Sequence, residues 1–162
     1  MRRQTSNQLT KLGKSKKELI PAIRGLSEDT YFTIFVFENN VKSWRRSLVK
    51  ATSANKNIAI TYVNNLKSGG GTNIYGSLEK AFKLAGDVNN SSSVLGVETI
   101  FLLSDGAPSA GKITSQNELI SEIEQWNSLD RVIINTIGLD NDQDKDFLSK
   151  LATNNRGVYI QK

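Results

Sequence analysis

The chain has 162 residues, of which 38% are hydrophobic and 23% are charged, and these values suit one globular domain with a single core. It contains no Cys and no His, which excludes disulfides, thiolate metal sites, His-liganded zinc and catalysis by a His base, although carboxylate or Lys chemistry would survive. No apolar run approaches the roughly 20 residues that cross a bilayer, and no apolar segment typical of a signal peptide follows the basic N-terminus.

The net charge of +5 is concentrated at the N-terminal end. Residues 1–24 carry seven Lys or Arg against one acidic residue, Glu18, whereas the rest of the chain carries fourteen basic and fifteen acidic residues. A basic stretch can follow phosphates, but a solvated helix face is the simpler interpretation. We therefore expect no nucleic-acid partner.

The first part of the chain predicts a helix followed by strands. Leu and Ile residues between 9 and 26 are spaced like a helix face, which Pro21 should kink or restart. The aromatic and β-branched run at 31–37 predicts one buried strand. Residues 38–40 then predict a short turn into an antiparallel edge strand at 41–44.

The rest of the chain alternates helices and strands. Amphipathic spacing predicts helices at 53–66, from 73 onward, over 119–126 and around 147–151. A buried strand is predicted at 99–103 and further strands at 132–137 and 157–160, and the Asn/Ser-rich stretch 87–96 predicts a surface loop. This alternation indicates parallel βαβ units in a doubly wound, Rossmann-like α/β sheet with one antiparallel edge strand.

Two polar loops are predicted to meet at one edge of this sheet. Three glycines at 69–71 follow Ser68, permit positive φ or close approach, and deliver the Thr72 hydroxyl at a helix start. Asp105 ends the apolar strand at 99–103. Ligands of open α/β sheets lie outside the carboxyl ends of the strands, so a hard cation held by a few oxygens is the simplest occupant.

These residues resemble the von Willebrand factor type A family. The metal-ion-dependent adhesion site (MIDAS) of that family combines Asp-x-Ser-x-Ser after the first strand, a Thr in a Gly-rich loop, and an Asp-Gly after the fourth strand. Gly70-Gly71-Thr72-Asn73 resembles the second loop, and Ser104-Asp105-Gly106 resembles the third. The resemblance covers the whole order of elements.

The resemblance implies a non-enzymatic, metal-dependent protein-binding module for adhesion or scaffolding. Thr72 and Asp105 would bind Mg²⁺ or Mn²⁺, and an acidic group of a partner protein would complete the oxygen shell. Ser68, Gly70, Gly71, Asn73, Ser104 and Gly106 would form the surrounding loops.

The Asp-x-Ser-x-Ser sequence does not occur in this chain. We therefore expect residues 1–162 to form a single A-type domain that lacks the central first strand, with Met1 an internal Met of a longer gene. The two remaining oxygen ligands should hold the cation weakly or not at all. The compartment, the partner and the oligomeric state cannot be read from the residues, and a structural domain without metal activity is an alternative.

Two other patterns suggest different sites. Gly106 to Lys112 follows a strand and precedes a helix, as a nucleotide-binding P-loop does, but Ile113 stands where a P-loop needs Ser or Thr. Acidic residues alternate as in an EF-hand at Asp140, Asp142, Asp144 and Asp146, but Lys145 and Leu151 replace the Gly and Glu of that loop. A helix N-cap at Asp142 is the simpler interpretation of the acidic run.

Overall fold

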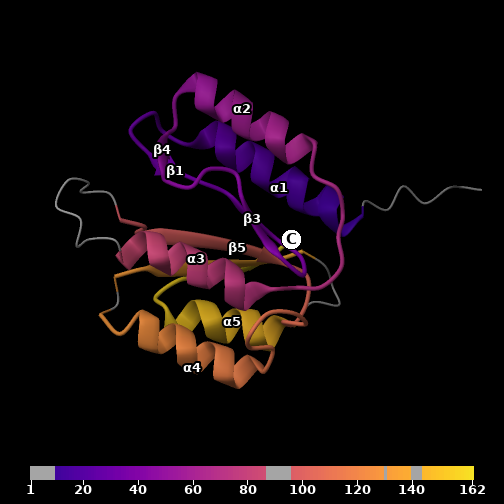
Figure 1. Ribbon diagram of the computed structural model, residues 1–162, viewed down its shortest axis with the longest axis vertical. Helices are drawn as coiled ribbons and strands as arrows, with labels where there is room; N and C mark the ends of the chain where they lie inside the picture. Colours follow the sequence, from indigo (N-terminus) through magenta and orange to yellow (C-terminus); the bar gives the residue numbers. More distant parts are fainter. Residues whose placement is uncertain (1–9, 87–95, 130, 140–143) are drawn as a thin grey trace, which may run out of the picture.

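The computed structural model describes residues 10–86, 96–129, 131–139 and 144–162 (Figure 1). In chain order its elements are α1 (Lys11–Gly25), β1 (Tyr31–Phe32), β2 (Phe35–Phe37), β3 (Val41–Ser43), β4 (Val49–Lys50), α2 (Ser53–Asn64), α3 (Ile74–Gly86), β5 (Thr99–Ser104), α4 (Gln116–Trp126), β6 (Ile133–Gly138), α5 (Lys145–Asn154) and β7 (Tyr159–Gln161). No helix in these ranges is long and apolar enough to cross a bilayer. The surface loop predicted at 87–96 falls almost wholly outside them.

The main sheet contains β5, β6 and β7, which run parallel to one another in that order. Leu103 lies opposite Ile137 of β6, which in turn lies opposite Ile160 of β7. The helices α4 and α5 form the connections between these strands, as parallel pairing requires. The predicted doubly wound α/β fold is therefore confirmed.

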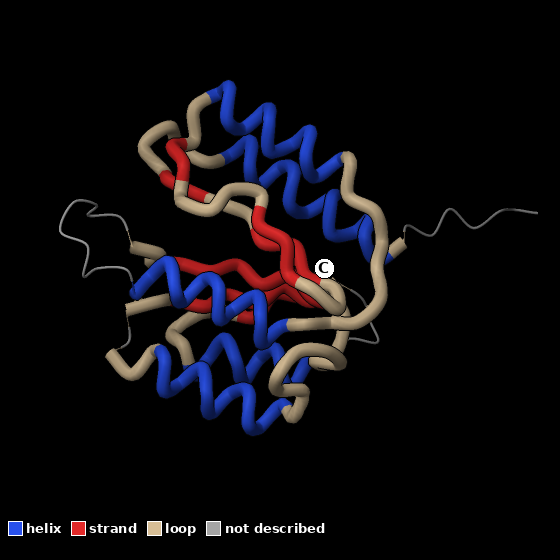
Figure 2. The backbone as a smooth tube through the Cα atoms, in the orientation of Figure 1, coloured by secondary structure: helices blue, strands red, loops and turns tan. Residues whose placement is uncertain are grey.

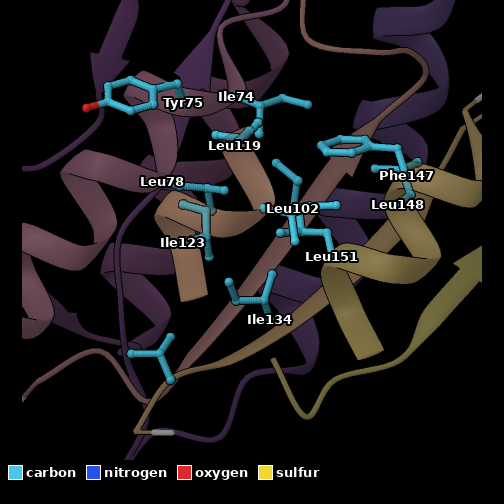
Figure 3. Packing of buried hydrophobic residues seen from close by; sticks show 12 residues of the cluster. Ile74, Tyr75, Leu78, Leu102, Leu119, Ile123, Ile134, Phe147, Leu148 and Leu151 are labelled. Carbon is cyan, nitrogen blue, oxygen red and sulfur yellow. The ribbon is translucent and has the colours of Figure 1, made fainter. Parts of the chain in front are cut away.

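Three helices cover one face of the main sheet (Figure 3). Alternate residues of β5 and β6 point into this core, so Leu102 is 3% exposed and Ile134 is fully buried. Val132, directly before β6, also belongs to this cluster. The helices α3, α4 and α5 supply the remaining buried members: Ile74, Tyr75, Leu78, Leu119, Ile120, Ile123, Phe147, Leu148 and Leu151.

The other face of the main sheet is not covered in this way. Phe101 is 64% exposed, and Val158 and Ile160 are 58% and 40% exposed. The prediction of a buried strand at 99–103 is therefore wrong for one of its two faces. The apolar run predicted burial on both faces, but a single sequence does not report whether an element packs on each side.

A second, smaller core holds the N-terminal part of the chain together. The helices α1 and α2 pack side by side over the β1–β4 region (Figure 2). Ile23 of α1, Ile34, and Ala59 and Val63 of α2 are its buried members. Phe32 stacks on Trp44 at a ring-centroid distance of 5.2 Å and extends this core toward the β2–β3 hairpin.

The single strand predicted at 31–37 is two strands in the structure. Tyr31 and Phe32 pair with β4, whereas Phe35 to Phe37 pair with β3. The partner changes at Thr33, whose hydroxyl donates to the carbonyl oxygen of Arg45 at 3.0 Å. These strand residues are exposed or half-buried, and only Ile34 between them is buried. The prediction of one buried strand was therefore wrong.

The helix ends also differ from expectation. Thr10 caps α1 by accepting a hydrogen bond from the Gly13 N–H at 3.1 Å, and α1 continues through Pro21 without a break. The cap of α5 is Asp144, which accepts from the Phe147 N–H at 3.1 Å. The predicted cap, Asp142, lies outside the described residues.

The sheet architecture predicts a domain of low stability. The free energy of unfolding of residues 1–162 should fall below about 5 kcal/mol, the lower end for native domains, because the uncovered sheet face contributes little burial. Urea denaturation combined with sedimentation velocity tests this. A monomeric, cooperative transition of ordinary stability would contradict it.

Candidate functional site

Asn73 joins three segments at the carboxyl edge of the sheet. Its backbone N–H donates to the Glu38 carbonyl oxygen at 2.9 Å, and its Nδ2 donates to the Asn39 carbonyl oxygen at 2.9 Å. Its Oδ1 accepts from the Gly76 N–H at 2.8 Å, which makes Asn73 the N-cap of α3. One side chain thus connects the β2–β3 turn to the start of α3.

The glycines before Asn73 lie against the same turn. Gly71 has a φ of +51°, and a Cβ atom at this position would lie 2.0 Å from Oδ1 of Asn39. A Cβ at Gly69 would lie 1.4 Å from Oε2 of Glu38, whereas a Cβ at Gly70 would make only ordinary contact. Gly71 is therefore favoured by its left-handed backbone conformation and by the close approach of Asn39, whereas a side chain at Gly69 would have to displace the flexible end of Glu38.

Thr72 is held by its backbone, and its side chain does not cap the helix. Its N–H donates to Oγ of Ser109 at 2.9 Å, and its carbonyl oxygen accepts from the Ser109 N–H at 3.1 Å. Because Asn73 supplies the cap, the Thr72 hydroxyl has no hydrogen bond to any described residue. The predicted placement of Thr72 beside a helix start is correct.

The loop after β5 meets the loop before α3 directly. Besides the Ser109 contacts, a Cβ at Gly111 would lie 2.2 Å from Oδ1 of Asn73, and Gly111 has a φ of +101°. The two polar loops predicted to share one edge therefore do so.

Asp105 follows the last residue of β5 and is mostly buried. Its side chain is 19% exposed, and its Oδ2 atom is buried without a hydrogen-bond partner among the described residues. Ser104, 3% exposed, turns its hydroxyl toward Gly106 instead, donating to the Gly106 carbonyl oxygen at 3.1 Å. Ser68 is exposed and makes no hydrogen bond with the described residues.

Lys11 supplies the positive charge that faces Asp105. Its Nζ lies 2.7 Å from Asp105 Oδ2, close enough for an ion pair, although the angles do not satisfy a hydrogen bond. Lys11 opens α1, so the start of this helix lies at the same carboxyl edge as the two loops. The Lys side chain is 73% exposed, and solvent therefore screens the pair.

The site residues that sequence reasoning missed are Lys11, Ser109 and Asn39. Lys11 lies 94 positions from Asp105 in the chain, and in the sequence it is only one of the seven basic residues in the segment 1–24. Ser109 lies in the loop considered for nucleotide binding. For Asn39 the one sequence signal was the run of glycines at 69–71, because such a run indicates that another segment approaches the backbone closely.

Lys112 and Asp144, which belong to the two rival patterns, have other contacts in the structure. Nζ of Lys112 lies 5.7 Å from the ring centroid of Tyr75, so this cation faces an aromatic ring of α3. Asp144 is used as the cap of α5, and the residues before it are not described. Within the described ranges, no three acidic side chains gather into a group that could hold a metal ion.

Comparison with known proteins identifies the fold family. The family model of the von Willebrand factor type A domain matches residues 5–160. The chain belongs to this family. This A-type chain is 32% identical over 152 residues to the inter-alpha-trypsin inhibitor heavy chain H2 of Sus scrofa. The match covers 90% of this chain and 16% of the length of that protein.

Solved structures of the family superpose on this A-type domain. A von Willebrand factor type A protein from Catenulispora acidiphila matches with a TM-score of 0.75 at 19% identity, covering 93% of this chain and 34% of that one. Proximal thread matrix protein 1 from the mussel byssus, with a zinc-occupied MIDAS motif, matches with a TM-score of 0.65 at 15% identity, covering 94% and 39%. These likenesses show the fold.

The glycine geometry gives a direct test of the loop. Gly71→Ala should lower the free energy of unfolding by about 1–3 kcal/mol, because Ala is strained at this positive φ and its Cβ would overlap Asn39. Gly106→Ala is the matched control, since no atom lies within 4 Å of a Cβ at Gly106. Urea denaturation of both variants measures the difference. Equal losses would show that the loop is not held against the β2–β3 turn.

Proposed function

We propose that this A-type domain is a non-enzymatic protein-binding module whose binding edge is built around Thr72 and Asp105. The observation that carries the proposal is the mostly buried Asp105 carboxylate at this edge, whose Oδ2 atom makes no hydrogen bond to the described residues and is contacted by a single exposed cation, the Lys11 ammonium, at 2.7 Å. A buried carboxylate oxygen is costly unless a cation or a ligand compensates it. The largely exposed Lys11 ammonium does so in the structure, and a divalent cation would bind the same carboxylate more strongly.

The donors at this edge suit a hard divalent cation such as Mg²⁺ or Mn²⁺. They are oxygens only, a carboxylate from Asp105 and a hydroxyl from Thr72, on loops that Ser109 connects. Mg²⁺ prefers six oxygen ligands in near-octahedral geometry. Two donors do not complete that shell, so waters and further carboxylate or hydroxyl groups would have to supply the rest, and the chain by itself should bind the ion weakly.

The partner that fits such an edge presents a carboxylate. A bound divalent cation would supply an electrophilic centre for that group. The chain's own contribution is to hold Asp105 and Thr72 on braced loops and to leave the Thr72 hydroxyl without a competing hydrogen bond from any residue that the structure describes. Among the solved structures with this fold is a pilus adhesin, SpaC, from Lactobacillus rhamnosus GG, which is in keeping with a binding role.

The remaining candidates are a P-loop-like nucleotide site at Lys112 and a structural domain without metal activity. A thermal-shift series on the chain extended by an apolar strand and Asp-x-Ser-x-Ser separates the three. Protection by Mg²⁺ or Mn²⁺ alone supports the proposal, protection that requires ATP favours the nucleotide site, and no response favours the structural domain.

Titration with Mg²⁺ tests the ligand assignment. In the chain extended by an apolar strand and Asp-x-Ser-x-Ser, Thr72→Ala and Asp105→Ala should each abolish cation-dependent partner binding, because each removes a direct oxygen ligand. Lys112→Ala should not, because Lys112 faces Tyr75. Calorimetric titration of Mg²⁺ into the extended and the unextended chain, with and without these substitutions, measures the binding. Tight Mg²⁺ binding by residues 1–162 that is insensitive to Asp105→Ala would mean that the site lies elsewhere.

Lys11 should compete with a divalent cation for Asp105. The Lys11 ammonium group contacts the Oδ2 atom of Asp105, the carboxylate that would bind the cation. Lys11→Gln should therefore tighten Mn²⁺ binding by about three- to tenfold. This change corresponds to about 1 kcal/mol, as expected for a charge that solvent screens. Lys112→Gln is the matched control and should leave the affinity unchanged. Electron paramagnetic resonance of free Mn²⁺ gives the affinities. Equal affinities in the wild type and Lys11→Gln would refute the competition.

A further inference from the structure

A long stretch in the middle of the chain is basic and contains no acid. Residues 39–78 include six Lys or Arg and no Asp or Glu. Four of these cations lie in residues 41–50, which form β3, the loop after it and β4, and which we call the β3–β4 segment. The four are exposed: Lys42, Arg45, Arg46 and Lys50. In Figure 1 the segment leads from β3 to β4, beside β1.

The two lysines of the β3–β4 segment already have acidic partners. Lys42 Nζ lies 3.3 Å from Oε1 of Glu38, and Lys50 Nζ lies 3.9 Å from Oδ1 of Asp29. The side chains of the two arginines form no ion pair and no hydrogen bond with any residue that the structure describes. A carboxylate therefore stands at each end of the segment, and two guanidinium groups between them remain without a described counter-charge.

Arg45 is held in place before any ligand arrives. Its guanidinium lies over the Trp44 ring, 5.1 Å from the ring centroid, and the Trp44 ring stacks in turn on Phe32 of the second core. The Arg45 carbonyl oxygen accepts from the Thr33 hydroxyl at 3.0 Å. Because the N–H groups of a guanidinium lie in its plane, stacking on a ring leaves them free to bind an anion.

We infer that the β3–β4 segment is a second contact surface of this domain, which binds a short acidic segment of a partner protein through Arg45 and Arg46. Arg45 would hold one carboxylate by two parallel N–H···O bonds, and Arg46 would hold a neighbouring one. The fixed position of Arg45 lowers the entropy that such a contact costs. The contact uses no divalent cation, so it is independent of the cation edge at Thr72 and Asp105.

The charges around the arginines favour a short acidic segment over a long polyanion. Nucleic acids are held by many phosphate contacts along an extended basic track. The β3–β4 segment offers two guanidinium groups without a described counter-charge, and the carboxylates of Glu38 and Asp29 at its ends would repel a chain of phosphates or sulfates. A stretch of partner chain with two or three neighbouring Asp or Glu residues is the ligand that fits.

A peptide with two Glu-Glu pairs separated by glycine, carrying an uncharged dye, probes this surface. Fluorescence anisotropy at low ionic strength, with EDTA present to remove divalent cations, should show binding to the full chain that weakens as salt is added. The NMR signals of the Arg45 and Arg46 Nε–H groups should shift during the titration. The control peptide has Gln in place of every Glu and should not bind.

Three variants separate this surface from general attraction to a basic protein. Arg45→Gln should weaken peptide binding about fivefold or more, because a charge-assisted bidentate contact is lost. Arg131→Gln removes the same charge from an exposed arginine directly before β6 and should bind as the wild type does. Arg45→Lys should weaken binding about threefold although it keeps the charge, because an ammonium group lacks the planar fork.

No binding of the Glu peptide, equal binding by Arg45→Lys and the wild type, or an equal loss in Arg131→Gln would overturn the inference. So would tighter, Arg45-dependent binding of a sulfated oligosaccharide of the same charge, which would make a polysaccharide the occupant. Because EDTA is present throughout, none of these outcomes depends on cation binding at Asp105. The cation edge keeps its own test in the Mn²⁺ titration.

Discussion

The hydrogen bonds of Asn73 are the constraint on which the candidate site depends. This residue caps α3 through Gly76 and binds two carbonyl oxygens of the β2–β3 turn, at distances of 2.8–2.9 Å. Each bond contributes about 1 kcal/mol, and together they fix the position of a loop that otherwise contains three flexible glycines. Because the Asn73 side chain performs the capping, the adjacent Thr72 hydroxyl makes no hydrogen bond to the described residues. Asn73 thus fixes the loop, while Thr72 is the residue proposed to bind the ligand.

The electrostatics of the edge follow from the same arrangement. The loop after β5 is bound to Thr72 by Ser109, which fixes the position of the segment that begins with Asp105. The facing Lys11 ammonium is largely exposed, and an ion pair of this kind contributes about 1 kcal/mol or less. Under the proposed function, a doubly charged cation with direct oxygen ligands would replace this ammonium group.

Local patterns predicted more of this structure than long-range pairing did. The helices at Ser53–Asn64 and Ile74–Gly86 and the glycine loop between them follow from apolar spacing and backbone freedom, which are properties of neighbouring residues. The change of partner at Thr33, the exposed Phe101 face and the Lys11–Asp105 contact depend on segments far apart in the chain. The site was predicted as two converging loops because strand order fixes where carboxyl ends lie. The residues that brace those loops were not, because hydrogen bonds such as Asn73 to Asn39 have no sequence signature.

The central claim is that Thr72 and Asp105 form one cation-binding edge. Paramagnetic broadening of amide NMR signals by substoichiometric Mn²⁺ tests it most directly, because the effect falls steeply with distance from the ion and is visible even when binding is weak. The account predicts that the signals of residues 71–73 and 104–106 broaden first, and that Asp105→Asn removes this effect. Broadening centred on the acidic run around Asp144, or unchanged by Asp105→Asn, would contradict the account.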